Sequence, residues 1–381
     1  MKKLLFAAAV ITAMASCSNN EIIDVNSGEG ISFRTSLDKA TRATANVTTK
    51  ENLTLFNVTA IGNSSSYFTN LLVSSTNQGL NWNTAQTYYW PSYELKFFAY
   101  APINDIGTVS IDQNAQTING FTPASDVAQQ KDLLVSCNTG TKDANEGTGV
   151  EMNFKHALSQ IEIKAKCSNP NIKIEVKGIR IVNPASSGNF TFPNTATQLG
   201  YTLPQGNWTD LKGTNNSAYK IKTSSDNVEL TNEAKSLMFG ENNFMLIPQH
   251  LTAWTGKGST DGAYISVLCR IYSKNGDQYT LLYPQPTTGD NKDNKFGYAS
   301  VAINTDWQPG KKYIYTLEFC SADTNGNGGG LIDPKPDTED KDVDPNPKDG
   351  SGGGDPVLNG PIKFTVAVDN WTDETENIIM N

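Results

Sequence analysis

The sequence has few of the side chains that catalysis most often uses. Its 381 residues include only two histidines, His156 and His250, and His156 stands among apolar residues in a strand-like pattern. Such a histidine is more often a hydrogen-bonded structural residue than a catalyst. No spacing pairs a histidine with a serine or cysteine nucleophile, and no nucleotide-binding or hydrolase motif is present. These absences argue against an enzyme, although the scattered carboxylates neither identify nor exclude a glycosidase pair.

The chain also lacks an excess of positive charge. Its 39 Asp and Glu residues outnumber its 30 Lys and Arg residues, which gives a formal net charge of −9 without a visible basic stripe. Because nucleic-acid binding depends on a basic surface, we do not expect nucleic acid as a partner. No cofactor is expected either, since no cofactor-binding motif is present.

Metal-binding patterns are incomplete. Residues 323–328 (DTNGNG) begin like a calcium loop, but Pro334 stands where the acidic twelfth ligand belongs. Residues 340–344 (DKDVD) have suitable spacing, but Pro345 replaces the glycine that turns such a loop. We therefore expect a solvated acidic segment and no metal site.

Cysteines are few and far apart. Beyond Cys17 there are four, and their spacing fits neither a zinc site nor a compact disulfide framework. Both buried free thiols and one or two disulfides remain open for Cys137, Cys167, Cys269 and Cys320.

The composition favours an all-β protein, because it is rich in Asn, Thr, Ser and Gly and poor in long helix-forming runs. Its length suffices for two domains, and Ser168–Asn171 is the best boundary, giving domains at 43–169 and 170–381. Gly178 predicts a bulge, and Gly276-Asp277 a hairpin turn. Alternating apolar and polar residues predict strands at 53–61, 67–73, 94–100, 132–137, 150–166, 172–182, 263–272 and 312–319, with a hairpin at 237–248.

The C-terminal region changes character at residue 323. Residues 323–360 are dominated by Gly, Asp, Pro, Asn and Lys, and we expect a flexible linker. A last strand follows within 361–371. A single strand cannot stand alone, so it must join a sheet of its own chain or of another molecule. Its apolar face consists of Ile362, Phe364, Val366 and Val368.

The N-terminus carries signals for export. Two lysines precede an apolar run at 4–15, which is too short to span a membrane, and Ser16-Cys17 follows. We read residues 1–17 as a lipoprotein signal peptide in which Cys17 is acylated. A short strand around Ile31 and Phe33 comes next. Arg42, beside Ala43, is either a site for a trypsin-like protease or an ordinary loop arginine.

Three consecutive aromatic residues suggest a second hypothesis. Tyr88, Tyr89 and Trp90 are able to stack on a sugar ring, as expected of a glycan-binding surface lipoprotein. More often such a trio straddles a strand and buries one face in the core.

Several stretches together resemble the fimbrillin family of Bacteroidales, the subunits of type V pili. The resemblance extends over nearly the whole chain as a pattern of anchors. These are the Ser16-Cys17 pair, Thr41-Arg42-Ala43, TYYWPSYELKFFAYAP (87–102), FKHALSQIEI (154–163), KKYIYTLEF (311–319) and IKFTVAVDNW (362–371).

The resemblance implies two transthyretin-like β-sandwich domains in tandem and export to the outer membrane as a lipoprotein. An arginine-specific protease at the cell surface would cut between Arg42 and Ala43. This cut would release the propeptide 18–42 with its first strand, Ile31 to about Leu37. A strand from another fimbrial subunit, Ile362 to Val368, would then fill the groove. The cleavable arginine and the apolar last strand favour a stalk or tip subunit that supports adhesion, because anchor subunits keep their lipid.

Overall fold

The computed structural model describes residues 29–37, 46–77, 79, 81–193, 203–285, 294–321 and 328–370. The described residues are almost entirely strand, turn and loop, which confirms an all-β protein. None of the helices among them is long and apolar enough to cross a membrane. They are the short helices η1 (Val127–Gln129), α1 (Lys142–Asn145) and η2 (Gln205–Asn207).

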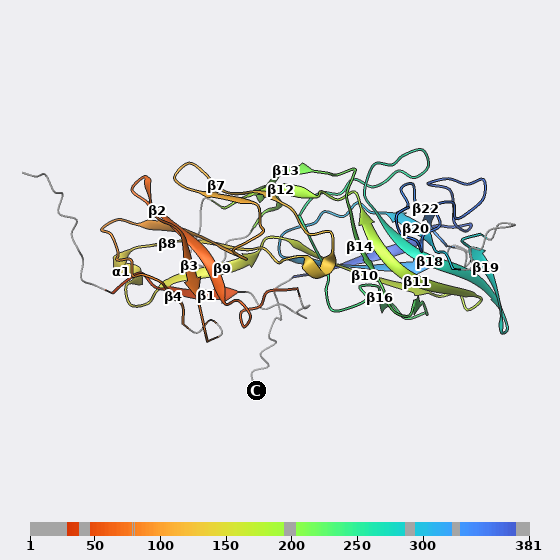
Figure 1. The fold of residues 1–381 in the computed structure, drawn as a ribbon, viewed down its shortest axis with the longest axis horizontal. Helices are drawn as coiled ribbons and strands as arrows, with labels where there is room; N and C mark the ends of the chain where they lie inside the picture. Colours follow the sequence, from red (N-terminus) through yellow and green to blue (C-terminus); the bar gives the residue numbers. More distant parts are fainter. Residues whose placement is uncertain are drawn as a thin grey trace, which may run out of the picture.

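The molecule is elongated, and its sheets form two lobes along the long axis (Figure 1). In the first lobe, the first sheet curls so that its two ends approach each other across an aromatic core. Its strands, in spatial order, are β1 (Phe33–Leu37), β9 (Val150–His156), β8 (Leu134–Gly140), β5 (Leu95–Ala101), β2 (Leu55–Gly62), β3 (Ser65–Ser74) and β4 (Asn83–Thr84).

A smaller second sheet covers the other face of the first sheet. Successive side chains of β5 point to opposite faces of the first sheet: Phe97 lies in the aromatic core, and Phe98 packs toward the second sheet. Trp208 donates from its indole nitrogen to the Ala157 carbonyl oxygen at 2.7 Å and so ties the two sheets together. The second sheet has the order β13 (Trp208–Lys212), β12 (Ser187–Thr191), β7 (Gln116–Phe121) and β6 (Thr108–Ile111).

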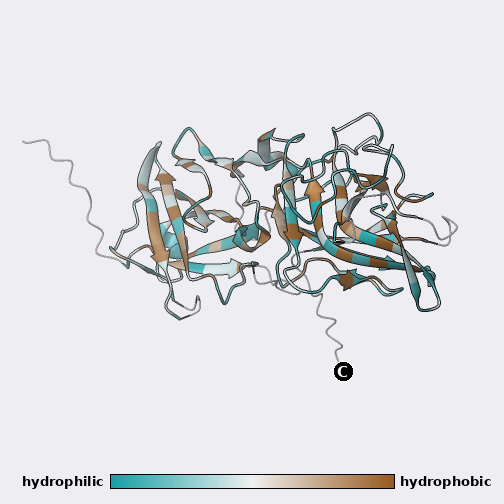
Figure 2. Cartoon of the chain, turned by 45° about the vertical axis from the view of Figure 1, so that its right-hand side comes forward, coloured by the Kyte–Doolittle hydropathy of each residue, from teal (hydrophilic) through white to brown (hydrophobic). Residues whose placement is uncertain are grey.

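The second lobe is a β-sandwich whose two sheets enclose one large apolar core. Figure 2 shows the alternation of apolar and polar bands along its strands that produces this core. The third sheet has the order β16 (Lys235–Ser236), β10 (Ser159–Cys167), β21 (Lys311–Phe319) and β23 (Lys363–Asn370), and β17 (Phe244–Leu246) also pairs with β10. The fourth sheet has the order β14 (Ala218–Lys222), β11 (Ile172–Val182), β18 (Tyr264–Asn275), β20 (Gly297–Ala302) and β22 (Leu331–Ile332), with β15 (Val228–Glu229) on β11 and β19 (Gln278–Tyr283) on β18.

Two local predictions are confirmed and one is wrong. The register of β11 against β18 shifts between Val176 and Gly178, as expected of a bulge. Gly276 has a φ of 61° in the turn that joins β18 to β19, a conformation that glycine adopts without strain. The hairpin expected at 237–248 does not form, because β16 and β17 both pair with β10 and not with each other.

The boundary expected at residues 168–171 lies one strand too late. The chain leaves the first lobe at Ala157, whose amide still donates to Leu133 of that lobe, and Leu158 already accepts from Gly310 of the second. Strands β12 and β13 then belong to the first lobe again. The apolar positions of the run 150–166 change phase, from even-numbered residues up to Leu158 to odd-numbered residues from Ile161 on. This change marks the place where the chain passes from one sheet to another.

Residues 328–360, here called the strap, correct the expectation of a flexible linker. The strap lies against the fourth sheet, where β22 pairs with β20 and Val343 packs on Phe296 and Tyr298. The strap is ordered because its few apolar residues, Ile332, Val343 and Val357, are buried and its backbone is hydrogen-bonded to the sheet. Its carboxylates also meet basic side chains of the sheet. Lys220 contacts Asp337 at 2.5 Å, and Lys222 bridges two further carboxylates of the strap, Asp340 at 2.8 Å and Asp342 at 2.6 Å.

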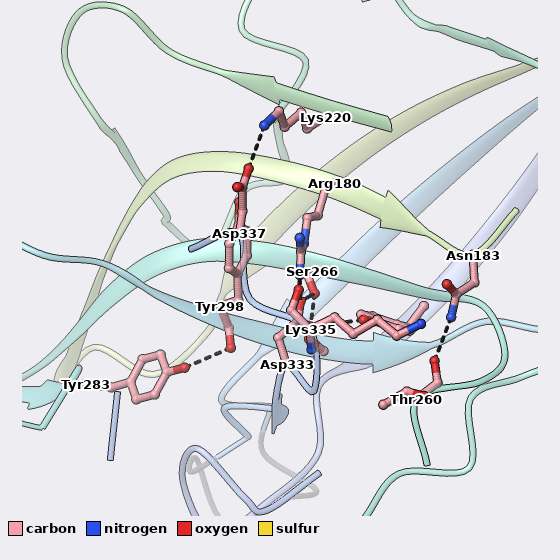
Figure 3. Close-up of polar contacts among 12 residues, drawn as sticks. Arg180, Asn183, Lys220, Thr260, Ser266, Tyr283, Tyr298, Asp333, Lys335 and Asp337 are labelled. Atoms are coloured by element: carbon pink, nitrogen blue, oxygen red, sulfur yellow. Dashed lines mark hydrogen bonds and ion pairs between the residues drawn. The ribbon is translucent and has the colours of Figure 1, made fainter. Parts of the chain in front are cut away.

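Asp333 anchors the strap in a buried polar cluster (Figure 3). Arg180 of β11 donates to its carboxylate at 2.5 Å, and Tyr264 donates to it at 3.0 Å. Ser266 also donates to this carboxylate, and the Arg180 guanidinium lies 4.2 Å from the centre of the Tyr298 ring. Burial alone would lower the pKa of Arg180, but the Asp333 carboxylate, together with Tyr298 and Tyr264, raises it above its ordinary value. The cluster therefore holds a buried charge pair with hydrogen bonds, the condition under which such a pair is tolerated.

Candidate functional site: the first and last strands

Strand β1 occupies an edge of the first sheet. It pairs in parallel with β9, in a register that runs from Phe33 opposite Val150 to Leu37 opposite Phe154. Among the described residues, no other strand pairs with β1. Its removal would therefore break a single ladder and leave the antiparallel body of the sheet in place.

The apolar face of β1 closes the core of the first lobe. Ile31, Phe33 and Leu37 are each only 7% exposed. The Phe33 ring meets the rings of Phe56 and Phe97 edge to face, with centroids 6.1 and 5.9 Å away. Because these two rings come from β2 and β5, β1 fills a groove across the curled sheet and does more than extend its edge.

Polar contacts of β1 are fewer and more exposed. Thr35 accepts a hydrogen bond from the indole nitrogen of Trp82 at 3.1 Å. On the outer side, Arg34 and Ser36 both contact Glu151 of β9, at 3.4 and 3.2 Å. Exposed ion pairs of this kind contribute little to stability. Apolar burial and the backbone ladder therefore hold β1.

The aromatic trio lies beside β1 and serves the fold. The amide of Ile31 donates to the Tyr88 carbonyl oxygen at 2.6 Å. Trp90 is buried against Phe97, and Tyr88 packs on Phe68 with ring centroids 4.8 Å apart. Of the three rings, only Tyr89 is exposed, so the trio packs into the core, the more frequent arrangement, and the alternative of a sugar-stacking platform does not form.

Strand β23 is an edge strand of the third sheet. It pairs antiparallel with β21 along its whole length, from Lys363 opposite Glu318 to Asn370 opposite Lys311. Its apolar face is covered unevenly: Ile362 is 3% exposed, Phe364 and Val366 are half-buried, and Val368 is 54% exposed. Among the described residues, no strand pairs with its outer edge. The strand thus keeps unused apolar surface and an open edge.

The processing residues fall outside the part of the chain that the structure describes. This concerns Cys17, Arg42 and Ala43; the described chain stops at Leu37 and resumes at Asn46. Sequence reasoning found Ile31 and Phe33 but missed their partners. The signal was present, because the alternation in 53–61 and 94–100 marks Phe56 and Phe97 as inward-facing residues.

The remaining polar residues have structural contacts. His156 Nδ1 lies 2.8 Å from the Asp132 carboxylate, and both side chains are fully buried. Asp132 also accepts from the Thr48 amide at 2.9 Å, so this pair joins β9 to the chain that precedes β2. His250 is largely exposed and lies 3.8 Å from Asp306. Within the described residues, no group of three or more His, Cys, Asp or Glu is placed to hold a metal ion.

The four cysteines are buried free thiols. Burial raises the pKa of Cys137 to about 12 and raises that of Cys269 further. A hydrogen bond between Cys320 and Cys167 lowers the pKa of Cys167 and raises that of Cys320. Of the two alternatives that spacing left open, the structure has the thiols.

Comparison with known proteins places the fold among fimbrial proteins. The model of a fimbrillin-like family matches residues 41–334. A fimbrial protein from Bacteroides vulgatus has a similar structure, with a TM-score of 0.52 at 14% identity over 91% of this chain and 100% of that one. Candidate cell adhesion proteins from Bacteroides ovatus (TM-score 0.44, 13% identity, 91% and 99% coverage) and Parabacteroides distasonis (0.47, 9%, 92% and 99%) are also found. A search of curated proteins finds no match.

Proposed function

Because this chain belongs to the fimbrillin-like family, we propose that it is a structural subunit, stalk or tip, of a cell-surface fimbria that supports adhesion. The subunit is exported as a lipoprotein acylated on Cys17 and is cut between Arg42 and Ala43. Loss of the lipid and of β1 opens a groove, and a strand of another subunit fills it. The role is structural and not catalytic.

The way β1 fills the first lobe carries this proposal. Fully burying an Ile, Phe or Leu side chain contributes roughly 1.5–3 kcal/mol, so Phe33 and Leu37 of β1 and the preceding Ile31 together contribute roughly 5–9 kcal/mol. A groove lined by Phe56, Phe97 and Phe154 would lose this burial when β1 leaves. Any strand that restores the apolar contacts and the ladder to β9 regains it, which is the energetic basis of strand addition.

Strand β23 has the properties that a donor needs. It is at an edge, it alternates, and its apolar face is only partly covered by its own lobe. The end of the strap sets the point from which β23 would detach, because the Gly360 carbonyl oxygen accepts hydrogen bonds from the amides of Gly329 at 2.9 Å and Gly330 at 3.2 Å. The donor segment therefore begins at Pro361 and is not swung from a long flexible linker.

Cleavage followed by gel electrophoresis tests the proposal. The purified full-length chain is treated with an arginine-specific protease and run in SDS without boiling. We expect a new N-terminus at Ala43 and an SDS-resistant ladder. Arg42→Ala should prevent both, whereas the control Arg34→Lys, which keeps Arg42, should leave both intact. A chain cut at Arg42 that stays monomeric at high concentration would refute the proposed function.

A further inference from the structure

The first and last strands of the chain share one pattern of side chains. Residues 31–37 read ISFRTSL and residues 362–368 read IKFTVAV. Both have Ile, then Phe, then a β-branched residue, then an aliphatic residue, at alternate positions. The two strands lie in different lobes and pair with different sheets. The packing of either strand in the folded subunit therefore does not require that the two share a sequence pattern.

The two strands differ in how well these side chains are covered. In the groove, the positions of Ile31, Phe33 and Leu37 are all 7% exposed. In its own lobe, by contrast, the apolar side chains of the last strand become more exposed along the strand, from 3% at Ile362 to 54% at Val368. Moving β23 into the groove would therefore bury more of its apolar face than its own lobe does, which favours exchange between molecules.

We propose that the groove of β1 accepts the last strand of a second copy of this chain in one register, with Ile362, Phe364, Val366 and Val368 in the places of Ile31, Phe33, Thr35 and Leu37. This inference rests on the proposed function and adds to it the identity of the partner and the alignment of the strand. The incoming strand runs parallel to β9, as β1 does.

The aromatic pocket fixes the register. Between the rings of Phe56 and Phe97 there is one aromatic position, now taken by Phe33, and the last strand offers one aromatic side chain, Phe364. A shift by one residue would turn every apolar side chain of the strand outward. A shift by two residues would remove the aromatic ring from the pocket and leave a cavity there.

Two differences between the strands give the proposal sharp consequences. Val366 has the shape of Thr35 but no oxygen to accept from the Trp82 indole, so Val366→Thr should strengthen docking about fivefold or more. Gly30 lies so close to Thr87 that a Cβ there would be 2.4 Å from its methyl group, and the donor has Pro361 at this place. Because the Thr87 side chain is exposed, it can rotate away, and Thr87→Ala should speed assembly.

Cysteine crosslinking in the assembled chain measures the register. Arg34 is now opposite Glu151, and the proposed register puts Thr365 there, at a spacing that suits a disulfide. Full-length Glu151→Cys/Thr365→Cys should give crosslinked ladders after cleavage with the arginine-specific protease. The neighbouring pairs, Glu151→Cys with Lys363→Cys or with Ala367→Cys, should crosslink at least tenfold less.

Peptide competition gives an independent measurement. A synthetic peptide of residues 361–371, added during cleavage of the unmodified chain, should cap the groove and shorten the ladder. The peptide with Phe364→Ala should lose at least tenfold in potency, and the one with Val366→Thr should gain. The control peptide with Ala367→Ser, altered on the opposite face, should match the parent.

The outcomes separate the two levels of the argument. The absence of any ladder from the cleaved wild-type chain would overturn the proposed function, and the present inference with it. A normal ladder that crosslinks best at Lys363 or Ala367 would overturn the register alone. A normal ladder that the peptide does not shorten would show that another strand, or a different protein, is the occupant.

Discussion

Replacing Phe33 by alanine should free β1 without cleavage. The side chain is 7% exposed and lies between two aromatic rings, so its truncation removes the largest apolar contact of the strand. Truncation of a buried phenylalanine to alanine costs about 3–5 kcal/mol. Because β1 is bound through one ladder at an edge, most of this cost falls on its attachment and little on the rest of the lobe.

This free-energy cost can be measured as an increase in the rate of hydrogen exchange. A cost of about 3–5 kcal/mol raises the population of the detached state roughly 10²- to 5 × 10³-fold. The Val150 amide reports this state directly, since it donates to the Ser32 carbonyl oxygen at 2.8 Å. We expect its hydrogen exchange to accelerate by that factor in Phe33→Ala, and uncut subunits to form ladders slowly at high concentration.

Phe190→Ala is the matched control. Phe190 is fully buried in the second sheet against Trp208 and lies away from β1, so its truncation should destabilise the lobe by a similar amount. Exchange at Val150 should then rise only with global unfolding. If exchange at Val150 rises no more in Phe33→Ala than in Phe190→Ala, β1 is an integral part of the lobe, and the argument for a separable strand is wrong.

Three further predictions concern the rest of the chain. Asp333→Ala leaves the buried Arg180 charge without its carboxylate and should cost about 3–5 kcal/mol, seen as a lower urea midpoint, whereas exposed carboxylates give less than 1 kcal/mol. Burial would raise the pKa of Asp340, but hydrogen bonds from Lys222 lower it below 3.8. The stabilisation that this gives the strap is present above pH 3.8 and is lost as the pH falls through the lowered pKa, so the protection of the strap amides from hydrogen exchange should decrease on acidification below pH 3.8. Because burial raises the pKa of Cys137 to about 12, its thiol should not react with Ellman's reagent at pH 8 until the chain is unfolded, and reaction in the native state would contradict its burial.

Much of the fold is readable from the sequence because its central strands alternate strongly. The run 172–182 alternates on both sides of Gly178 and forms β11 with those bounds, and 312–319 forms all but the first residue of β21. The sequence does not predict the strands of the second sheet, since β6 and β12 are short and have only two apolar residues in four and one in five, respectively. Alternation gives the two faces of a strand, but it does not say which strand lies beside it.

The site was only partly predictable for a similar reason. The alternation of 361–369 and the apolar residues at 31 and 33 identified both terminal strands. The composition of the strap predicts a flexible segment, and this prediction is wrong. The strap is held by contacts with residues distant in sequence, such as that of Asp333 with Arg180, 153 positions away. A low content of apolar residues does not predict disorder where those few residues are buried and the backbone and carboxylates have partners.

The position of the groove and the donor in different lobes has a consequence for assembly. When one surface of a subunit binds a different surface of the next, the contact is head-to-tail and does not close a symmetric pair. Each added copy would consume one groove and present another. Such a fibre has two chemically distinct ends, one with an empty groove and one with an unused strand, so a subunit that lacks either feature could only start the fibre or stop it.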